Sequence, residues 1–429
     1  MVRHQACRRG PACGRSVGVA DLEYSPTMDH DTARNIQLVH DHAVAYGSLP
    51  VVIAEGEGAW VRDVAGNRYL DLVSAYSAMN FGHRHPALVA ALEQQLQRVT
   101  LTSRAVYHDQ LGPFCQELAA LLGMDAVIPL STGAEAVETA VKGARRWAYE
   151  FRGVPDDQAE IIVAEGNFHG RTTTMVGLSS DRATQRGFGP FTPGFVTVPY
   201  GDAQALEQAM SDRTAAVLLE PIQGEGGVWV PPVGYLRRVR ELCDAHGVLF
   251  IADEIQTGLG RTGATLACDH EGVRPDLVTV GKPLSGGMLP LSALAGRREV
   301  MDVFTAGSPG STFAGNPLAC AVGRAVIELL GPGDLQRRAT QLGEHLRARL
   351  QGEDLPAVVE VRGKGLWAGI DLAPSAGSAR GLCERLLQRG VLCKESRERT
   401  LRLAPPLIIS TQDLDWGLDQ LIDELRAAG

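Results

Sequence analysis

The sequence lacks three features that would place it in well-known classes of protein. It has no excess of basic residues, and its net charge of −9 argues against a general surface for nucleic acid or anionic membranes. It has no apolar run as long as a membrane span. Its eight cysteines form no C-x-x-C pair. Their scatter argues against a zinc site or a disulfide framework and indicates a reducing compartment.

The N-terminal segment lacks both acidic residues and the apolar stretch of a secretory signal. Residues 1–20 contain Arg3, Arg8, Arg9 and Arg15. Organelle transit peptides share this composition, so mitochondrial targeting is the alternative to the simpler interpretation. We expect residues 1–27 to be a disordered leader of a cytoplasmic protein.

The middle of the chain has a regular alternation of short apolar runs and helical stretches. Strands that are buried on both faces and separated by helices indicate a largely parallel sheet. Ligands of such sheets bind beyond the carboxyl ends of the strands. The predicted strands are Ala126–Leu130, Ile161–Ala164, Ala215–Leu219, Val248–Ala252, Leu277–Val280 and Leu291–Ala295.

The two ends of the chain have a different pattern. Residues 58–71 predict a β-hairpin around a Gly-Asn turn. After about residue 316 come helices, two short strand candidates (Val358–Val361 and Leu366–Ile370) and a final amphipathic helix. A chain of 429 residues is too long for one ordinary core. We expect a large domain over 96–315 and a smaller α+β domain built from 28–95 and 316–429.

Two strand ends carry side chains that suit pyridoxal phosphate (PLP). Asp253 follows one predicted strand and Lys282 follows the next. A lysine amine forms an imine with this cofactor, and a carboxylate pairs with its protonated pyridine nitrogen. From these two residues alone, a structural ion pair is an equal alternative.

A third feature supplies a place for a phosphate. Residues 131–135, Ser-Thr-Gly-Ala-Glu, directly follow a predicted strand and open a helix. Exposed N–H groups at a helix N-terminus bind phosphate. Such turns are common, so the feature gains weight only beside Asp253 and Lys282.

With these features in place, the chain resembles the class III aminotransferases of PLP fold type I from about residue 40 to its end. Further motifs, including Ser74–Asn80 and Leu401–Leu407, resemble the ornithine-type members of that class. The motifs that carry the class resemblance are Gly133–Ala136, Asn167–Thr172, Glu220–Glu225, Asp253–Gly263, Gly281-Lys282 and Gly310–Pro317. The resemblance implies an α/β fold, with a mostly parallel sheet of the seven-stranded type in a large domain and a smaller α+β domain.

The resemblance also implies how PLP is held. Lys282 would be the Schiff-base lysine and the base that moves the substrate proton, and Asp253 would bind the ring nitrogen. Gln256 would hydrogen-bond the phenolic oxygen. Phe168 would stack on the ring, where ordinary core packing is the alternative role.

The phosphate contacts implied by the resemblance extend to a second subunit. Gly133 and Ala134 would donate backbone N–H groups to the phosphate. Thr312 would reach the phosphate of the neighbouring subunit, which implies a homodimer. A simple turn hydroxyl is the alternative role for Thr312.

The resemblance assigns substrate contacts to five residues. Arg402 would grip the near carboxylate of glutamate, and Glu225 would cover Arg402 while an ω-amine donor is bound. Arg171 would hold the distal carboxylate, and Tyr46 and Tyr76 would shape the far end of the pocket. An Arg–carboxylate bond is bidentate and charge-assisted, so an exchange of carboxylates at Arg402 is a workable switch.

The implied reaction is transfer of the δ-amine of ornithine to 2-oxoglutarate, giving glutamate 5-semialdehyde and glutamate. The segment Lys394–Thr400 departs from the family pattern, as do the flanks of Tyr46 and residues 306–309. These departures leave other donors open, namely N-acetylornithine, 4-aminobutyrate and lysine. A PLP aminomutase or racemase is the alternative from another reaction class.

Overall fold

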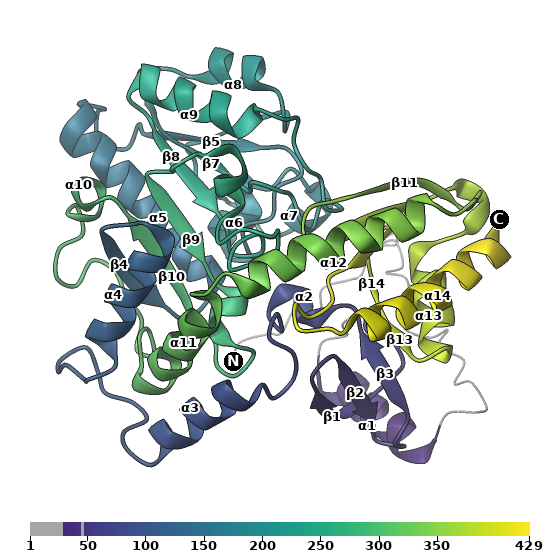
Figure 1. Ribbon diagram of the computed structural model, residues 1–429. Coiled ribbons are helices and arrows are strands. Elements are labelled where there is room, and N and C mark those ends of the chain that lie inside the picture. Colours follow the sequence, from purple (N-terminus) through teal and green to yellow (C-terminus); the bar gives the residue numbers. More distant parts are fainter. Residues whose placement is uncertain (1–28, 44–46) are drawn as a thin grey trace, which may run out of the picture.

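The centre of the molecule is a seven-stranded mixed sheet in the order β4-β10-β9-β8-β7-β5-β6. A computed structural model describes residues 29–43 and 47–429, and Figure 1 shows this sheet surrounded by helices. All neighbouring strands from β9 to β6 run parallel, whereas β10 is antiparallel to both β9 and β4. The strands are β4 (Ala126–Leu130), β5 (Glu160–Ala164), β6 (Phe195–Val198), β7 (Thr214–Leu219), β8 (Leu249–Asp253), β9 (Leu277–Val280) and β10 (Ser292–Gly296).

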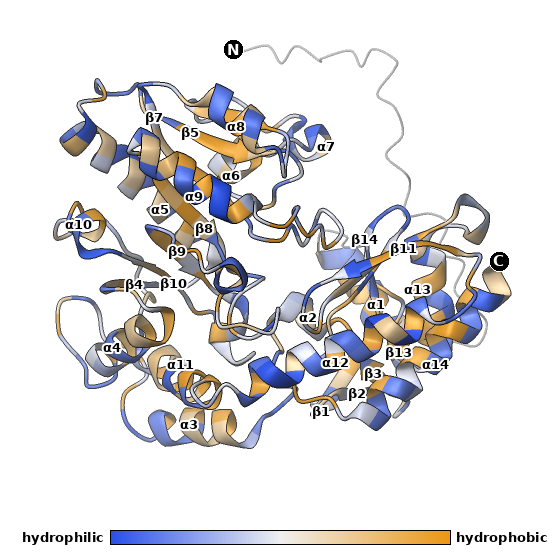
Figure 2. Cartoon of the chain, turned by 45° about the horizontal axis from the view of Figure 1, so that its top comes forward, coloured by the Kyte–Doolittle hydropathy of each residue, from blue (hydrophilic) through white to orange (hydrophobic). Residues whose placement is uncertain are grey.

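The central strands are apolar because both faces of the sheet are covered. Every residue of β7, β8 and β9 is buried, and these strands are strongly hydrophobic in Figure 2. All six predicted runs are strands of this sheet. The seventh, β6, was not predicted, because it is an edge strand with only one fully buried residue, Val198.

Helices on both faces connect the strands. Large apolar clusters lie on the two sides, one containing Val239 of α9 and the other Val137 of α5. The helices around the sheet are α3 (Pro86–Leu96), α4 (Leu111–Leu122), α5 (Gly133–Trp147), α6 (Thr173–Leu178), α7 (Arg182–Gln185), α8 (Ala203–Ala209), α9 (Tyr235–His246), α10 (Arg298–Met301) and α11 (Pro317–Leu330).

A second unit combines both ends of the chain. The predicted hairpin is present as β2 (Trp60–Asp63) and β3 (Arg68–Asp71), and β3 pairs in parallel with β13 (Val391–Leu392). A further sheet has the order β11-β12-β15-β14. The remaining elements are α1 (His30–His42), β1 (Ile53–Glu57), α2 (Ser74–Ser77), β11 (Val358–Gly363), β12 (Ala368–Leu372), β14 (Lys394–Arg397), β15 (Thr400–Leu403), α12 (Asp334–Gln351), α13 (Ala379–Gln388) and α14 (Thr411–Ala428).

The core clusters show which helices pack with which sheet. Leu88 of α3 and Val326 of α11 belong to a cluster with the large sheet, whereas Leu418 of α14 packs with the small unit. Both α3 and α11 fall outside 96–315 for all or most of their length, yet they cover the large sheet. We retain the division at residues 95 and 315 as a proposal about domain boundaries. Across the described residues, no helix is both long enough and apolar enough to span a bilayer.

Candidate active site

The predicted lysine and carboxylate meet at the carboxyl edge of the large sheet. Asp253 is the last residue of β8, and Lys282 follows β9 after one glycine. Both line a cavity of about 210 Å³. The cavity is lined by Gly133, Ala134, Phe168, His169, Gly170, Glu220, Asp253, Ile255, Gln256 and Lys282. The structure therefore brings together six residues that the sequence assigned to PLP.

Asp253 is buried and held in one orientation by three donors. Its Oδ2 lies 2.6 Å from Nδ1 of His169, and its Oδ1 accepts from the Ile255 N–H and the Thr279 hydroxyl, each at 3.1 Å. Burial opposes the protonation of His169, but the hydrogen bond and the charge of Asp253 outweigh it and raise the pKa of His169. The carboxylate is therefore oriented by three neighbouring donors, of which the His169 ring is the nearest.

Lys282 is half-buried and carries its amine next to charges of both signs. Burial lowers the pKa of Lys282, since a buried ammonium loses its hydration. Glu225 opposes this shift, and Arg402 adds to it. Its amine donates to no atom of the described chain. A lysine of this kind exchanges its proton more readily than a surface lysine does.

The start of helix α5 presents free N–H groups to the cavity. Thr132 caps the helix through a capping box with Glu135, in which the Thr132 hydroxyl accepts from the Glu135 N–H at 3.2 Å. The N–H groups of Gly133 and Ala134 donate to no atom of the described chain. They are the positive end of a helix with no partner of its own, which is the arrangement that binds phosphate.

Phe168 and Gln256 complete the cavity wall. The Phe168 N–H donates to the Glu220 carboxylate at 2.8 Å, which fixes the segment that carries the ring. Gln256 donates through its side-chain amide to the carbonyl of Tyr76 at 3.4 Å. Burial raises the pKa of Glu220 to about 7, with His169 lowering it and Asp253 raising it further.

Arg402 and Glu225 form the ion pair that the sequence predicted. Arg402 Nη1 donates to Glu225 Oε1 at 2.7 Å, and Arg402 is only 3% exposed. Its second terminal nitrogen, Nη2, is buried and has no hydrogen-bond partner among the described residues. Burial raises the pKa of Glu225, but the charges of Arg402 and Lys282 more than offset this, and the net direction is downward. Glu225 is therefore an anion that Arg402 holds with one side of its guanidinium.

Tyr76 covers Arg402 from a strained turn of the chain. The Arg402 guanidinium lies 4.9 Å from the centre of the Tyr76 ring, within the range of a cation–π contact. Residues 74–77 all have positive φ, from 44° to 75°, although none is glycine. Left-handed backbone costs roughly 1–2 kcal/mol per residue for side chains other than glycine. Strain of this size persists where the surrounding structure imposes it, most often at functional sites.

Three predicted residues lie elsewhere. Arg171 lies outside the reaction cavity, in the neighbouring pocket, with its guanidinium 5.5 Å from the ring centre of Phe168. Thr312 is exposed and does not line the cavity of its own chain. Tyr46 lies outside the described residues.

Two residues of the site had no predicted role. His169 and Glu220 both stand inside motifs that resemble the family, yet only the folded chain shows that they contact Asp253 and Phe168. Besides those motifs, the signal available in the sequence was that both residues follow buried strands, β5 and β7, since ligand sites gather at such strand ends.

The fold, the lysine in the cavity and the oriented carboxylate together define a class of protein. The profile of the family described as "Aminotransferase class-III" matches residues 42–425, and the chain belongs to this family. The predicted α/β fold of PLP fold type I is thereby confirmed. Enzymes of the family depend on PLP and act on amino acids and keto acids.

Individual members of the family with similar sequences and structures are named aminotransferases of ornithine or acetylornithine. The chain is 53% identical over 392 residues to the ornithine aminotransferase of Bacillus subtilis (strain 168), covering 91% of this chain and 97% of the relative. A crystal structure of ornithine aminotransferase from Toxoplasma gondii ME49 matches with a TM-score of 0.90 and 43% identity, over 92% of this chain and 95% of that one. The acetylornithine aminotransferase of Elizabethkingia anophelis matches with a TM-score of 0.84 and 43% identity, over 92% and 98%.

Proposed function

We propose that this chain is an ornithine δ-aminotransferase, which passes the δ-amine of ornithine to 2-oxoglutarate by way of PLP. The observation that carries the proposal is the ion pair of Glu225 with the buried Arg402, in which one nitrogen of Arg402 is left unpartnered beside Tyr76. Relatives named ornithine aminotransferase at 52–54% identity over most of the chain support the same donor.

The cavity fits PLP in its charges and free donors. The unpartnered N–H groups of Gly133 and Ala134 suit the phosphate, and Asp253 suits a protonated ring nitrogen. Phe168 would pack on the ring, and Gln256 would donate to its phenolic oxygen. Lys282 would hold the cofactor through Nζ. When bound, PLP supplies an electron sink that stabilises negative charge on the substrate carbon.

The residues of the chain then act on the substrate. Lys282 Nζ moves the proton from the substrate carbon, and its lowered pKa favours the neutral amine that this step needs. Arg171 binds the α-carboxylate of ornithine at the distal end of the pocket. Glu225 keeps Arg402 occupied meanwhile, so that an α-carboxylate cannot dock next to the reacting carbon.

Glutamate and 2-oxoglutarate use Arg402 instead. Their carboxylate beside the reacting carbon replaces Glu225 on the guanidinium, and the unpartnered Nη2 allows a two-point contact. Replacing one carboxylate by another leaves no buried charge without a partner, which keeps the cost of the exchange low.

We also propose that the active unit is a cytoplasmic homodimer in which Thr312 completes the phosphate site of the partner. Thr312 lies next to Phe313, which is 59% exposed. Residues 309–315 border the same pocket as residues 102–108, which include Tyr107, and Tyr107 is 96% exposed. Exposed aromatic side chains of this kind are typical of an interface. Their position favours contact with a second copy.

A panel of amine donors with 2-oxoglutarate tests the proposed function. Ornithine should give glutamate together with the cyclic product of glutamate 5-semialdehyde, detected with an aromatic aldehyde trap. N-acetylornithine, 4-aminobutyrate and lysine should react far more slowly. Lys282→Ala should abolish turnover and the visible absorbance of the lysine-bound cofactor. Faster reaction with N-acetylornithine than with ornithine would refute the assignment of ornithine as the amine donor.

A further inference from the structure

A second pocket lies next to the reaction cavity. It has a volume of about 560 Å³ and shares Phe168, His169 and Gly170 with the cavity that contains Lys282. Glu225 also lines it. The pocket therefore borders both the reaction cavity and the pair of Glu225 with Arg402, and we call it the mouth of the site.

Three arginines line the mouth without a counter-ion. Arg171, Arg182 and Arg397 all border it and are exposed. Within the described chain none of their guanidinium groups forms a hydrogen bond or an ion pair, and Arg171 contacts only the ring of Phe168. Guanidinium groups of one pocket that lack carboxylate partners can bind carboxylates of a ligand.

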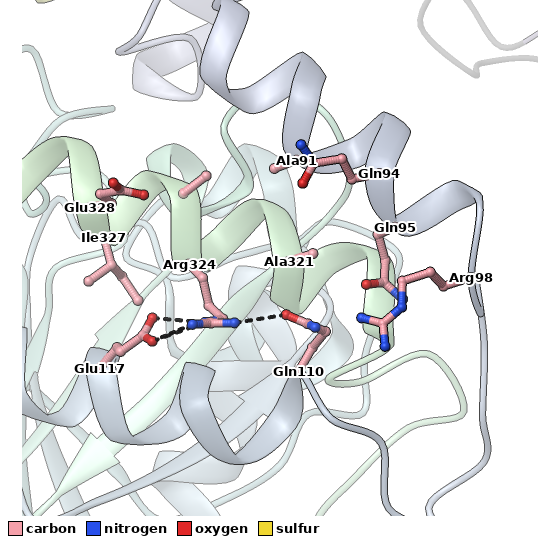
Figure 3. A pocket seen from close by; sticks show the side chains of 11 residues that line it. Ala91, Gln94, Gln95, Arg98, Gln110, Glu117, Ala321, Arg324, Ile327 and Glu328 are labelled. Carbon is pink, nitrogen blue, oxygen red and sulfur yellow. Dashed lines mark hydrogen bonds and ion pairs between the residues drawn. The ribbon is translucent and has the colours of Figure 1, made fainter.

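A hollow elsewhere on the molecule shows a different arrangement. It lies between α3, α4 and α11, and Figure 3 shows Arg324 between Glu117 and Gln110. Arg324 donates to both Glu117 oxygens at 2.8–3.0 Å. Arg98 in the same hollow pairs with Asp109 at 2.7 Å. The arginines there are already satisfied, so the free arginines of the mouth are not a general feature of pockets on this surface.

Both walls that carry the new arginines are fixed in place. On one wall, the Ser396 hydroxyl next to Arg397 donates to the Glu225 carbonyl at 2.8 Å, which ties β14 to the loop of the ion pair. On the other wall, Gln185 anchors α7 by donating to the Ser179 carbonyl at 2.7 Å. Arg182 and Arg397 therefore face one pocket from separate elements, and α7 lies on the side of the large domain nearest the small unit (Figures 1 and 2).

The acidic residues of the mouth do not cancel this charge. Glu225 is paired with Arg402. Asp181 also lines the mouth and caps α7 by accepting from the Ala183 N–H at 2.9 Å, so three arginines face one carboxylate that has no arginine partner. The mouth therefore keeps an excess of positive charge, although the chain as a whole carries a net charge of −9.

We propose that Arg182 and Arg397, together with Arg171, form a recruiting site for the dicarboxylate substrate and determine which substrate enters efficiently. The identity of that substrate as 2-oxoglutarate rests on the proposed function. A dicarboxylate is attracted to the mouth at both of its ends. Ornithine carries a net positive charge, and beyond the contact of its α-carboxylate with Arg171 it gains nothing from Arg182 and Arg397. The arginines speed the second half of the reaction without touching the reacting atoms.

Binding of glutarate to the holoenzyme tests the recruiting site without requiring turnover. Glutarate has both carboxylates and no carbonyl that can react. Arg182→Gln and Arg397→Gln should each weaken it about two- to fivefold, and the double variant about tenfold, as measured by calorimetry at low salt. Added salt should weaken binding to the wild type more than to the double variant.

The chain offers matched controls for both positions. Arg186 at the end of α7 and Arg399 beyond β14 are exposed and have no side-chain partner in the described chain, but neither lines the mouth. Arg186→Gln and Arg399→Gln remove the same charge and should leave glutarate affinity unchanged. Equal weakening in the controls, or unchanged affinity in Arg182→Gln and Arg397→Gln, would overturn the recruiting site.

Kinetics separate this inference from the proposed function. In the mouth variants, KM for 2-oxoglutarate should rise while kcat/KM for ornithine stays the same or increases. A wild type that binds glutarate through these arginines but does not accept ornithine would refute the proposed donor and leave the dicarboxylate site standing.

Discussion

At the scale of single residues, specificity rests on what a buried arginine holds when the substrate is absent. Arg402 is nearly inaccessible to water, and Glu225 occupies only one of its terminal nitrogens. A buried charge that loses its partner destabilises the site, so an incoming carboxylate has to replace Glu225 rather than simply remove it. Because Nη2 of Arg402 has no hydrogen-bond partner, a substrate carboxylate that binds both terminal nitrogens is favoured over Glu225.

Replacing Glu225 tests this exchange. Glu225→Ala leaves Arg402 free, so α-amino donors such as glutamate should gain about tenfold relative to ornithine, as expected for a charge-assisted hydrogen bond of about 1.5 kcal/mol. Initial rates with each donor measure the ratio. Glu360→Ala is the control. Glu360 also accepts from an arginine, Arg362, at 3.0 Å, but it does not line the reaction cavity. An unchanged donor ratio in Glu225→Ala would contradict the gate.

Glu220 gives the site a pH dependence of its own. Burial raises the pKa of this carboxyl from 4.5 to about 7, so the folded protein binds the proton more tightly than the unfolded chain does. The resulting stabilisation is complete below pH 4.5 and is lost as the pH rises through about 7.

The variant Glu220→Gln removes this titration while keeping an oxygen that can accept from the Phe168 N–H. Its holoenzyme should match the wild type in thermal midpoint near pH 4.5. It should become more stable than the wild type by on the order of 1–3 kcal/mol at pH 8. Midpoints measured across this range check the direction. If the difference in thermal midpoint between Glu220→Gln and the wild type shrinks as the pH rises, Glu220 is ionised across the whole range.

At the scale of elements, burial determined what the sequence could predict. The runs that became β4, β5, β7, β8, β9 and β10 were recognisable because helices cover both faces of those strands. Strand β14, Lys394–Arg397, has no apolar periodicity, since its side chains are charged or polar and none is fully buried. Its place beside Glu225 depends on contacts between distant segments, and so the mouth could not be predicted.

The turn at residues 74–77 is another element that the sequence does not reveal. The residues Ser-Ala-Tyr-Ser have no glycine to announce a left-handed conformation, yet all four adopt it. Tyr76 reaches Arg402 only because of this turn, and its carbonyl accepts from Gln256. The strain therefore connects the substrate end of the pocket with the cofactor end.

Substitutions at Ala75 test the turn without removing a packed side chain, because Ala75 is exposed. Ala75→Gly tolerates the positive φ and should leave the thermal midpoint and KM for ornithine close to wild type. Ala75→Val places a branched side chain in a region it strongly disfavours, and should cost about 1–2 kcal/mol and raise KM. Equal behaviour of the two variants would show that the turn relaxes freely.

At the scale of the whole molecule, residues of two structural units form the site, so the relative position of these units must be maintained. Lys282 and Asp253 belong to the large sheet, whereas Arg402 lies on β15 of the small unit. Arg261, fully buried, joins them by donating to the carbonyls of Leu366 and Pro405 at 2.7 and 2.8 Å. Burial lowers the pKa of Arg261 to about 9, and the charge of Asp71 opposes this shift. Because Pro405 follows Arg402 by three residues, this contact fixes the distance between the ion pair and the lysine.

In the proposed homodimer, Thr312 of each chain contacts the phosphate site of the other chain. A mixed dimer of two variants can test this contact. We expect Lys282→Ala to be inactive and Thr312→Ala to release PLP faster than the wild type, since one phosphate contact is lost. If Thr312 acts on the partner's cofactor, a dimer of the two variants contains one site with Lys282 from one chain and Thr312 from the other. That site should retain PLP with the wild-type dissociation rate and show half the activity of a wild-type dimer. Differently tagged chains, co-expressed and purified through both tags, provide this dimer. A mixed dimer that releases PLP as fast as Thr312→Ala itself would show that the threonine serves its own chain.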